Sequence, residues 1–229
     1  SDSFPVRVAE NLYIRDAYRD SIYKWIDESE LLEEKDYVYS DLGYYYFQRI
    51  IERLSGLKLE DYVRQHFYDP LGTFYTGYLP RERFRPDRLV PTENDMIFRR
   101  QLLRGDVHDP GTAMLGGVCG HAGIFSNAND LAKIMQMYLN GGYYGGKRYF
   151  SDSTVAKFTQ SPFREVNGNR RALGFDKPVL EEDKPGPTCK GISEKSFGHT
   201  GFTGTIAWAD PDEEVVYIFL SNRIHPDQD

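Results

Sequence analysis

Two short groups of residues bring together side chains that can move protons and hold anions. The first is Tyr-Ser-Asp at residues 39–41, directly before a strongly amphipathic run, and the second is His-Thr-Gly-Phe-Thr-Gly at residues 199–204. Tyrosine and histidine can relay protons, and a backbone N–H beside glycines can stabilise an oxyanion. Each group alone also fits a structural role, a helix cap for the first and a tight turn for the second. Neither group by itself therefore indicates a function.

A serine nucleophile needs a base beside it, and a lysine one helical turn later supplies one. Ser21 and Lys24 have this spacing. However, Ser21 follows Asp20 on the polar side of a run whose apolar face uses Ile22 and Ile26. A pattern with two fixed positions also arises easily by chance, so we do not expect Ser21 to be a nucleophile.

Histidines and cysteines could also form a metal or redox site. His108, Asp109 and His121 lack an HxxxH spacing or a cysteine partner, so loop-stabilising hydrogen bonds are the favoured interpretation. Cys119 and Cys189 lie 70 residues apart, which excludes a CxxC motif and a zinc ribbon and leaves open whether the two pair. We expect no metal and no cofactor.

The composition is that of a globular protein. The chain has 229 residues, of which 40% are hydrophobic and 28% charged, enough for one sizeable core or two small ones. A net charge of −7 argues against nucleic acid, and the basic run at 81–88 is interrupted by Glu82, Pro86 and Asp87. No stretch approaches the ~18 apolar residues of a membrane span, and the first residues do not form a signal peptide. We therefore expect no membrane span and no export signal within the chain as given.

Apolar spacing predicts the helices that must position these groups. It predicts an amphipathic helix over 16–28 and a stronger one that begins at Ser40 or Asp41 and ends at Gly56. A third helix is expected over 60–67, a fourth from a Ser126 cap to Gly141, and a fifth over 153–159. Residues 72–123 are rich in glycine and proline, and we expect loops there with short strands near 89–90 and 102–103.

The last part of the chain predicts strands. They are expected over 196–199, 204–209 and 214–221, with a hairpin loop at 210–213. The run 215–220 is apolar at every position, which predicts a central strand covered by helices on at least one side. Helices first and a small antiparallel sheet last is an α+β pattern. So small a sheet leaves an edge and a face uncovered, so we expect a fragment of a larger fold.

Taken together, the two motifs resemble those of the penicillin-recognising serine hydrolases. They occur in this order and 160 residues apart, with Gly-Gly-Val-Cys-Gly-His-Ala-Gly-Ile-Phe-Ser at 116–126 and a capped helix between them. The family comprises serine β-lactamases, D-Ala-D-Ala carboxypeptidases and related esterases. Residues 39–41 look like its Tyr-x-Asn element in the class-C-like branch, and residues 199–201 like its Lys/His-Thr-Gly element. Residues 90–93, 104–109 and 120–123 are similar to a β-lactamase-related branch, so the resemblance covers nearly the whole chain.

The resemblance implies roles for individual residues. Tyr39 would be catalytic and relay a proton between a serine nucleophile and the leaving group. His199 would supply a donor toward Tyr39 or a substrate carboxylate, and the backbone N–H of Phe202 would form half of an oxyanion hole. The substrate-binding residues implied are Asp41, His199, Thr200, Gly201, Phe202 and Thr203.

The sequence departs from the family pattern in two ways. Asp41 stands where the penicillin-binding members have Asn, so a carboxylate that only accepts hydrogen bonds replaces an amide that also donates. This departure weakens the hypothesis that the protein hydrolyses antibiotics. The family's Ser-x-x-Lys helix lies several tens of residues before the Tyr motif, whereas 38 residues precede Tyr39 here. We therefore expect residues 1–229 to be a single incomplete domain, mainly helical over 1–160 and mainly antiparallel strands over 161–229.

The expected function follows from this resemblance. The chain would be the C-terminal portion of a serine hydrolase domain that lacks its N-terminal strands, nucleophile helix and final helix, and would be inactive alone. The intact protein would transfer acyl groups from small amides, esters or cell-wall peptides to water, in the periplasm or cell envelope of a bacterium. An upstream glycosidase domain of the same protein is one implied partner. Two alternatives remain open, a non-catalytic binding or structural module that retains the cleft, and a peptidase-like module that needs a metal.

Overall fold

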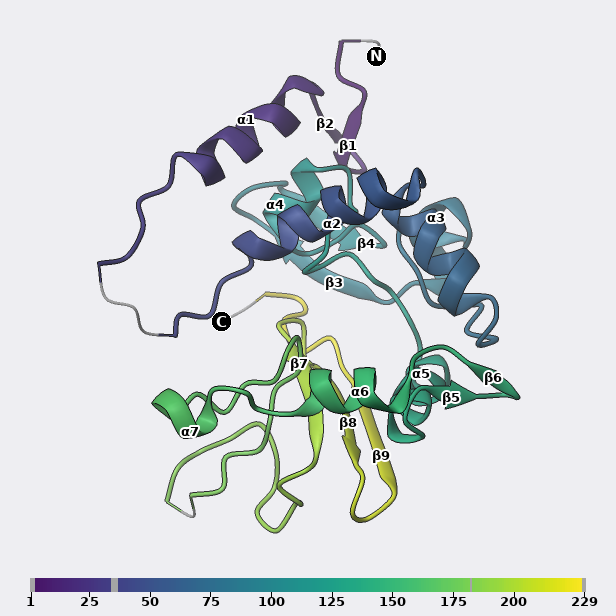
Figure 1. Cartoon of the computed structure of the whole chain (residues 1–229). Helices are drawn as coiled ribbons and strands as arrows, with labels where there is room; N and C mark the ends of the chain where they lie inside the picture. Colours follow the sequence, from purple (N-terminus) through teal and green to yellow (C-terminus); the bar gives the residue numbers. More distant parts are fainter. Residues whose placement is uncertain (1–2, 34–36, 182, 228–229) are drawn as a thin grey trace. The chain divides into compact units, whose positions relative to one another are not determined.

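The computed structural model of the chain describes residues 3–33, 37–181 and 183–227 (Figure 1). The chain forms two compact units. Unit 1 comprises Ser1–His66, Thr76–Phe125 and Asn222–Asp229, and unit 2 comprises Phe67–Tyr75 and Ser126–Ser221. Helices dominate the first 160 residues, although three two-stranded ribbons also lie there. That residues 1–229 make up one incomplete domain stays a prediction.

Unit 1 begins with a hairpin that the sequence pattern did not predict. Strands β1 (Val6–Ala9) and β2 (Leu12–Ile14) pair antiparallel, and helix α1 (Ala17–Asp27) follows. From β1, Val8 is buried with Val107 and Ala113, which ties the hairpin to the middle of the chain. Helix α1 buries Ile22 and Tyr23 in a second cluster that includes Cys119. The predicted helix over 16–28 is confirmed.

The predicted second helix is confirmed as α2 (Leu42–Ser55). At its start, the Ser40 hydroxyl accepts a hydrogen bond of 3.2 Å from the Leu42 N–H. At its end, Gly56 adopts a left-handed φ of 71°, a conformation that glycine reaches without a Cβ clash. The third predicted helix is divided into α3 (Leu59–Val63) and one π-helical turn, η1 (Arg64–Tyr68).

The middle of the chain is mainly loops, as expected, with short elements among them. The 3-10 turns η2 (Pro80–Glu82) and η3 (Pro86–Arg88) precede an antiparallel hairpin of β3 (Pro91–Asp95) and β4 (Gln101–Arg104). A strand was expected near residues 89–90, but β3 begins at Pro91, after the 3-10 turn η3. Helix α4 (Pro110–Met114) was not predicted, although the Asp109 side chain caps it at 2.6 Å from the Thr112 N–H and proline opens its first turn.

Unit 2 contains the fourth predicted helix, α5 (Ala128–Leu139). Its cap is Asn127 and not Ser126, because the Asn127 backbone is extended and its side chain accepts a 2.8 Å hydrogen bond from the Asp130 N–H. A small ribbon of β5 (Tyr143–Tyr144) and β6 (Lys147–Arg148) was missed. Helix α6 (Asp152–Thr159) begins after the Ser151 cap, and α7 (Arg164–Asn167) is a single turn.

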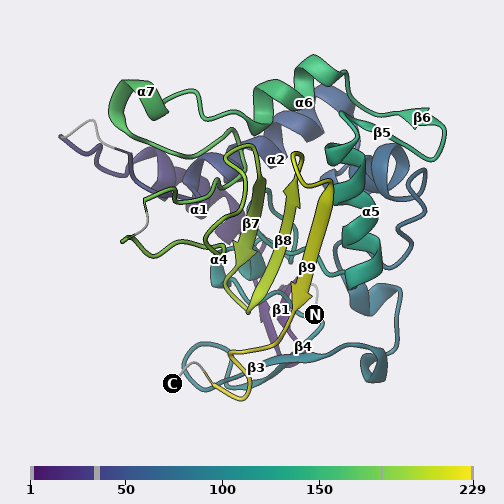
Figure 2. The same cartoon turned by 90° about the horizontal axis from the view of Figure 1, so that it is seen from below.

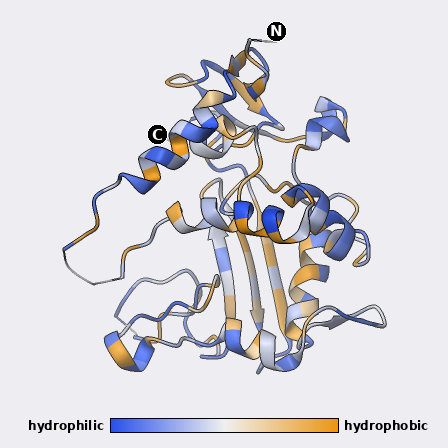
Figure 3. Cartoon of the chain, turned by 45° about the horizontal axis from the view of Figure 1, so that its top comes forward, coloured by the Kyte–Doolittle hydropathy of each residue, from blue (hydrophilic) through white to orange (hydrophobic). Residues whose placement is uncertain are grey.

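Strands β7 (Phe197–Gly201), β8 (Thr205–Asp210) and β9 (Val215–Leu220) form an antiparallel sheet in that order (Figure 2). His199 lies opposite Ala207, which lies opposite Ile218. Helix α5 packs against β8 and β9, and Met135 shares a buried cluster with Phe197 and Ala209. In Figure 3, orange is most extensive along the apolar strand β9, whereas β7 is mostly pale. The α+β class predicted for the chain is thus confirmed.

Helical cover on at least one side of residues 215–220 is confirmed, because α5 packs against β9, but the predicted central position in the sheet is wrong. In the described part of the chain, β9 is the last strand of the sheet. Val215, Tyr217 and Phe219 are 50%, 55% and 53% exposed, whereas Val216 and Ile218 pack toward the α5 cluster. Successive side chains of a strand face opposite sides of the sheet, so α5 covers only one of the two apolar sets.

Candidate functional site

The second predicted motif lies at the end of an edge strand. Strand β7 ends with His199, Thr200 and Gly201, and residues 202–204 turn the chain into β8. The Gly204 N–H closes this turn on the Gly201 carbonyl oxygen at 3.0 Å. A Cβ on Gly201 would meet the Thr205 hydroxyl, so a larger residue there would require the Thr205 side chain to move. Thr200, Gly201 and Phe202 are exposed and Thr203 is half-buried.

Both ring nitrogens of His199 have hydrogen-bond partners. Its Nε2 atom lies 2.9 Å from Nη1 of Arg171, and its Nδ1 atom lies 2.7 Å from the Thr200 carbonyl oxygen. Arg171 was not among the predicted site residues. It comes from the irregular segment between α7 and β7, where no periodic pattern marks it.

The same segment pairs with the outer edge of β7. The Asp176 N–H donates to the Gly198 carbonyl oxygen at 2.7 Å, and the Gly198 N–H donates back at 3.1 Å. The buried Asp176 carboxylate forms an ion pair with Arg170 and lies 3.6 Å from Nε of Arg171. One carboxylate therefore fixes two arginines beside the His-Thr-Gly motif.

The first predicted motif lies in unit 1, immediately before α2. Tyr39 and Asp41 are exposed, and Asp41 occupies the N-cap position of α2 without a side-chain capping bond. His199 belongs to unit 2. The approach of Tyr39 to His199 therefore stays a prediction, as do the roles assigned to both motifs.

Residues 104–109 and 116–126, which also carry part of the resemblance, contribute to a buried histidine network. Nε2 of His121 lies 3.0 Å from Asp109 and 3.1 Å from the Thr112 hydroxyl. Burial lowers the pKa of His121, but the hydrogen bond to Asp109 and the influence of the neighbouring Cys119 and Asp109 side chains outweigh it and raise the pKa to about 10. Burial raises the pKa of Asp109, but the bonds from His121 and Thr112 bring it down to about 2.

The other histidine of this region also stabilises a loop, as expected. His108 lies 2.8 Å from Glu93, and the carbonyl oxygens of Val107 and His108 each accept a 2.6 Å bond from the guanidinium of Arg99. Within residues 3–33, 37–181 and 183–227, no group of three metal-ligating side chains comes together. Cys119 is buried, Cys189 is exposed, and both are free thiols.

Ser21 and Lys24 are not arranged as nucleophile and base. The Ser21 hydroxyl donates to the Ala17 carbonyl oxygen at 3.2 Å, and Lys24 lies 3.7 Å from Glu28. Each side chain is thus engaged elsewhere on α1, which agrees with a chance match.

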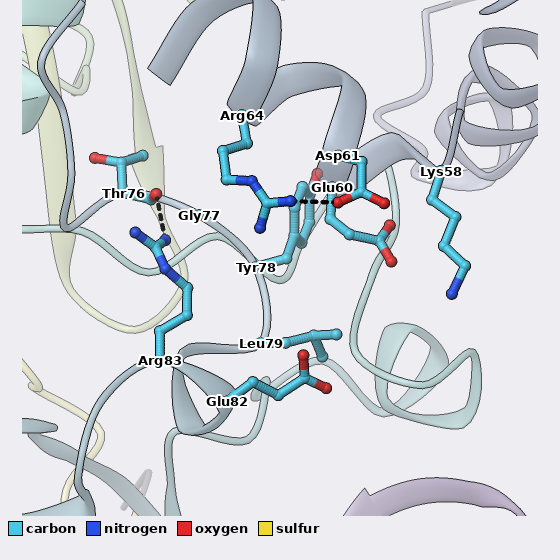
Figure 4. A pocket seen from close by; sticks show the side chains of 10 residues that line it. All are labelled: Lys58, Glu60, Asp61, Arg64, Thr76, Gly77, Tyr78, Leu79, Glu82 and Arg83. Atoms are coloured by element: carbon cyan, nitrogen blue, oxygen red, sulfur yellow. Dashed lines mark hydrogen bonds and ion pairs between the residues drawn. The ribbon is translucent and has the colours of Figure 1, made fainter. Parts of the chain in front are cut away.

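A cleft of about 220 Å³ lies within unit 1, away from the predicted motifs in sequence (Figure 4). Both acidic and basic side chains line its walls. Arg64 pairs with Asp61 at 2.6 Å, and Arg83 donates to the Thr76 carbonyl oxygen at 3.0 Å. Burial raises the pKa of Glu60 in this cleft. None of the predicted site residues lines it.

Comparison with known proteins agrees with the motifs and the fold. The model of the Beta-lactamase family matches residues 7–229. A protein of Salmonella gallinarum named "Putative D-alanyl-D-alanine carboxypeptidase" is 35% identical over 202 residues, which cover 82% of this chain and 46% of that protein. The chain thus spans about half the length of the curated relatives it matches.

Two solved structures show the same fold at low sequence identity. A penicillin-binding protein homologue from Caulobacter crescentus matches with a TM-score of 0.59 and 19% identity, over 90% of this chain and 58% of that one. EstCE1, described as a hydrolase with promiscuous acyltransferase activity, matches with a TM-score of 0.55 and 18% identity, over 85% and 54%. The fold and the motifs define a domain of the β-lactamase and penicillin-binding-protein type. The chain belongs to the Beta-lactamase family.

Proposed function

We propose that this chain is the C-terminal part of a serine hydrolase that transfers the acyl group of amides or esters to water. The observation that carries the proposal is the position of the His-Thr-Gly motif, at the exposed end of edge strand β7 with the turn at 202–204 following it. An extended substrate can lie along such an edge, because edge N–H and C=O groups pair with an added chain.

In this proposal the chain supplies a proton relay and an anion-stabilising turn. Tyr39 passes a proton between the nucleophile and the leaving group, and the Phe202 N–H donates to the oxyanion. Thr200 and Thr203 offer hydroxyls to the substrate, which Gly201 allows to approach closely. Asp41 only accepts hydrogen bonds, so it favours substrates that present an N–H or O–H donor at that position.

The nucleophile belongs to the remainder of the protein in this proposal. The curated relatives are about twice as long as the matched segment, which leaves room for a Ser-x-x-Lys helix outside it. Small amides, esters and cell-wall peptides are the proposed substrates, because the relative from Salmonella gallinarum is named a carboxypeptidase and EstCE1 a hydrolase. A bacterial periplasm or envelope is the proposed location, with a glycosidase domain upstream. In the described part of the chain, no helix is both long and apolar enough to cross a bilayer.

Covalent labelling tests this proposal. A fluorophosphonate probe is applied to residues 1–229 and to the full-length protein, and adducts are located by mass spectrometry. We expect a stoichiometric adduct on a serine outside residues 1–229 and none on the chain alone. An adduct on Ser21, Ser40 or Thr203 would show that the chain holds its own nucleophile. A full-length protein without any adduct would favour the non-catalytic binding module.

Turnover of a p-nitrophenyl ester by the full-length protein tests the proton relay. Tyr39→Phe removes the hydroxyl and should lower kcat by about 10²–10⁴-fold, the usual contribution of a positioned acid or base. Tyr37→Phe is the matched control, because Tyr37 is also exposed and lies two residues earlier. Equal activity of the two variants would exclude a catalytic role for Tyr39.

A further inference from the structure

The cleft of about 220 Å³ in unit 1 lies between two segments that are both held to the core. Helix α3, on one side, buries Leu59 in one cluster with Tyr78. The segment 76–83, on the other side, is tied down at Gly77, whose N–H and carbonyl oxygen exchange hydrogen bonds of 3.0 and 2.9 Å with the backbone of Phe125. The backbone on both sides of the cleft is therefore fixed before any ligand binds.

The side chains that line this cleft carry positive and negative charges in equal number (Figure 4). The basic ones are Lys58, Arg64 and Arg83, and the acidic ones are Glu60, Asp61 and Glu82. A ligand of one charge is attracted by one set and repelled by the other, whereas a ligand that carries both charges can be attracted by both. The lining therefore favours a dipolar ligand.

Glu60 is the acidic group that such a ligand can neutralise. It is half-buried, and Arg64 follows it by four residues, a spacing at which helical side chains commonly pair. Arg64 pairs with Asp61 instead, at 2.6 Å. Among the residues that the structure describes, Glu60 takes part in no ion pair, and burial raises its pKa. A carboxylate that is partly removed from water and lacks a counter-charge is suited to bind an ammonium group.

Arg64 supplies the opposite charge. A guanidinium has five N–H donors, and the bond to Asp61 uses one of them, on Nη2. The side chain is 44% exposed, so a ligand carboxylate can reach the other donors. The Cβ atoms of residues four apart on a helix lie about 5–6 Å from each other. The ends of an extended dipeptide are at most about 7 Å apart, so one dipeptide can reach both Glu60 and Arg64.

The volume of the cleft limits the size of the ligand. Pockets for drug-sized molecules measure about 300–1,000 Å³, and this cleft is smaller, at about 220 Å³. Tyr78 and Leu79 add an apolar part to the lining, against which a methyl group can pack. Both features favour a short peptide with small side chains.

We propose that this cleft binds a zwitterionic dipeptide with small side chains, with the ammonium group at Glu60 and the carboxylate at Arg64. The inference is independent of the proposed function, because none of the residues with a role in that function lines the cleft. It adds a second binding site to the protein, for a free peptide.

Calorimetric titration of the full-length protein with three matched probes tests the ligand class. Alanylalanine carries both charges, its N-acetyl derivative lacks the ammonium group, and its C-terminal amide lacks the carboxylate. We expect the free dipeptide to bind at least about tenfold more tightly than either derivative, because each derivative loses one charge-assisted interaction. Equal binding of the three probes, or binding of none, would overturn the proposal.

Substitutions then locate the binding site. Glu60→Gln should abolish the preference for the free dipeptide over its N-acetyl derivative, and Arg64→Gln should abolish the preference over the amide. Glu60→Asp keeps the charge and should retain part of the first preference. Glu181→Gln and Arg148→Gln are the matched controls, because both residues are exposed, form ion pairs outside the cleft and should leave both preferences unchanged.

Urea unfolding of each variant separates a loss of binding from a loss of folding. The Arg64 pair is exposed, so its removal should change the free energy of unfolding by no more than about 1 kcal/mol. Preferences that survive both Glu60→Gln and Arg64→Gln in folded variants would place the dipeptide elsewhere and overturn the proposal. Preferences that the two control variants abolish as well would also overturn it.

Discussion

Nε2 of His121 lies 3.0 Å from Oδ1 of Asp109, which is also the cap of helix α4. The His121 side chain is 5% exposed, and its ring centroid lies 4.6 Å from that of the buried Tyr45. The ion pair thus joins the cap of α4 to the loop that follows it. The ring contact with Tyr45 joins that loop to α2. Tyr45 and Cys119 belong to one buried cluster, so the His121 ring lies beside a core of unit 1.

His121→Gln should destabilise the chain because it removes a buried cation from Asp109. We expect a loss on the order of 2 kcal/mol in the free energy of unfolding, as for other buried hydrogen-bonded groups that lose a partner. Urea unfolding measures it. His66→Gln is the control, because His66 is exposed and should change the midpoint little. Similar losses in both variants would contradict a special role for the pair.

The stabilisation from this pair should depend on pH at both ends of the range. The folded-state pKa of His121, about 10, lies above its ordinary value of 6.5, so its contribution is complete below pH 6.5 and is lost as the pH rises through 10. The folded-state pKa of Asp109, about 2, lies below its ordinary 3.8, so its contribution is complete above pH 3.8 and is lost as the pH falls through 2. The difference between wild type and His121→Gln should therefore be largest near pH 5 and small at pH 10. A constant difference would show that the charge is not involved.

Asp95 should be a second stabilising carboxylate, in the turn between β3 and β4. It accepts hydrogen bonds from the N–H groups of Ile97, Phe98 and Arg99 and from Nε of Arg99 at 2.7 Å. Burial raises the pKa of Asp95, but these bonds outweigh it and bring the pKa down to about 2. Asp95→Asn leaves the Arg99 guanidinium, 2% exposed, without its counter-charge, at a cost of about 3–5 kcal/mol.

The matched control for Asp95→Asn is Asp87→Asn. Asp87 also pairs with an arginine, Arg85 at 3.3 Å, but both side chains are exposed. Exposed pairs contribute about 0–1 kcal/mol, so this variant should unfold near the wild-type urea concentration. Equal midpoints for the two variants would show that Arg99 finds another partner.

The longer elements were predictable because their patterns repeat over many residues. Helix α2 has a wide apolar stripe and a terminal glycine, and β8 and β9 are separated by a polar hairpin loop. The ribbons β1–β2 and β5–β6 have strands of two to four residues, too short for a period to show. The central position predicted for β9 was wrong for another reason. The sequence shows that both faces of this strand are apolar. Which face is covered depends on the neighbouring elements, which the local sequence does not show.

The position of a candidate motif was predictable where the motif coincides with the end of an element. His199, Thr200 and Gly201 lie at the end of β7, as their glycines and position suggested. Arg171 was missed because it lies 28 residues before His199 in an irregular segment, and its contact with β7 depends on the pairing of Asp176 with Gly198. Likewise, the sequence suggested hydrogen bonds for His121, but only the fold shows that Asp109 is the partner.

Tyr39 and His199 should converge at one cleft although they belong to different units. The expectation follows from the family resemblance, in which both motifs face the same substrate. It can be measured with a short bismaleimide cross-linker in a Tyr39→Cys, Thr200→Cys variant that also carries Cys189→Ser to remove the exposed native thiol. We expect an intramolecular cross-link by mass spectrometry. Glu213→Cys replaces Thr200→Cys in the control, because Glu213 lies in the hairpin loop at the opposite end of β8. Equal yields for the two pairs would contradict convergence.

The alternation along β9 predicts opposite effects for neighbouring residues. Tyr217→Thr and Phe219→Thr replace side chains that are about half exposed, so each should change the free energy of unfolding by no more than about 1 kcal/mol while lowering the binding of an apolar dye. Val216→Thr and Ile218→Thr place a hydroxyl against the α5 cluster and should each cost about 1–3 kcal/mol. All four substitutions place threonine in the strand, and the replaced residues are all good strand formers, so strand propensity is held nearly constant and the difference reports burial. Urea unfolding and dye fluorescence of residues 1–229 measure both effects. If the odd-numbered variants were as destabilising as the even-numbered ones, both faces of β9 would be buried in the isolated chain, most simply by self-association through the exposed face, which the concentration dependence of the midpoint would reveal.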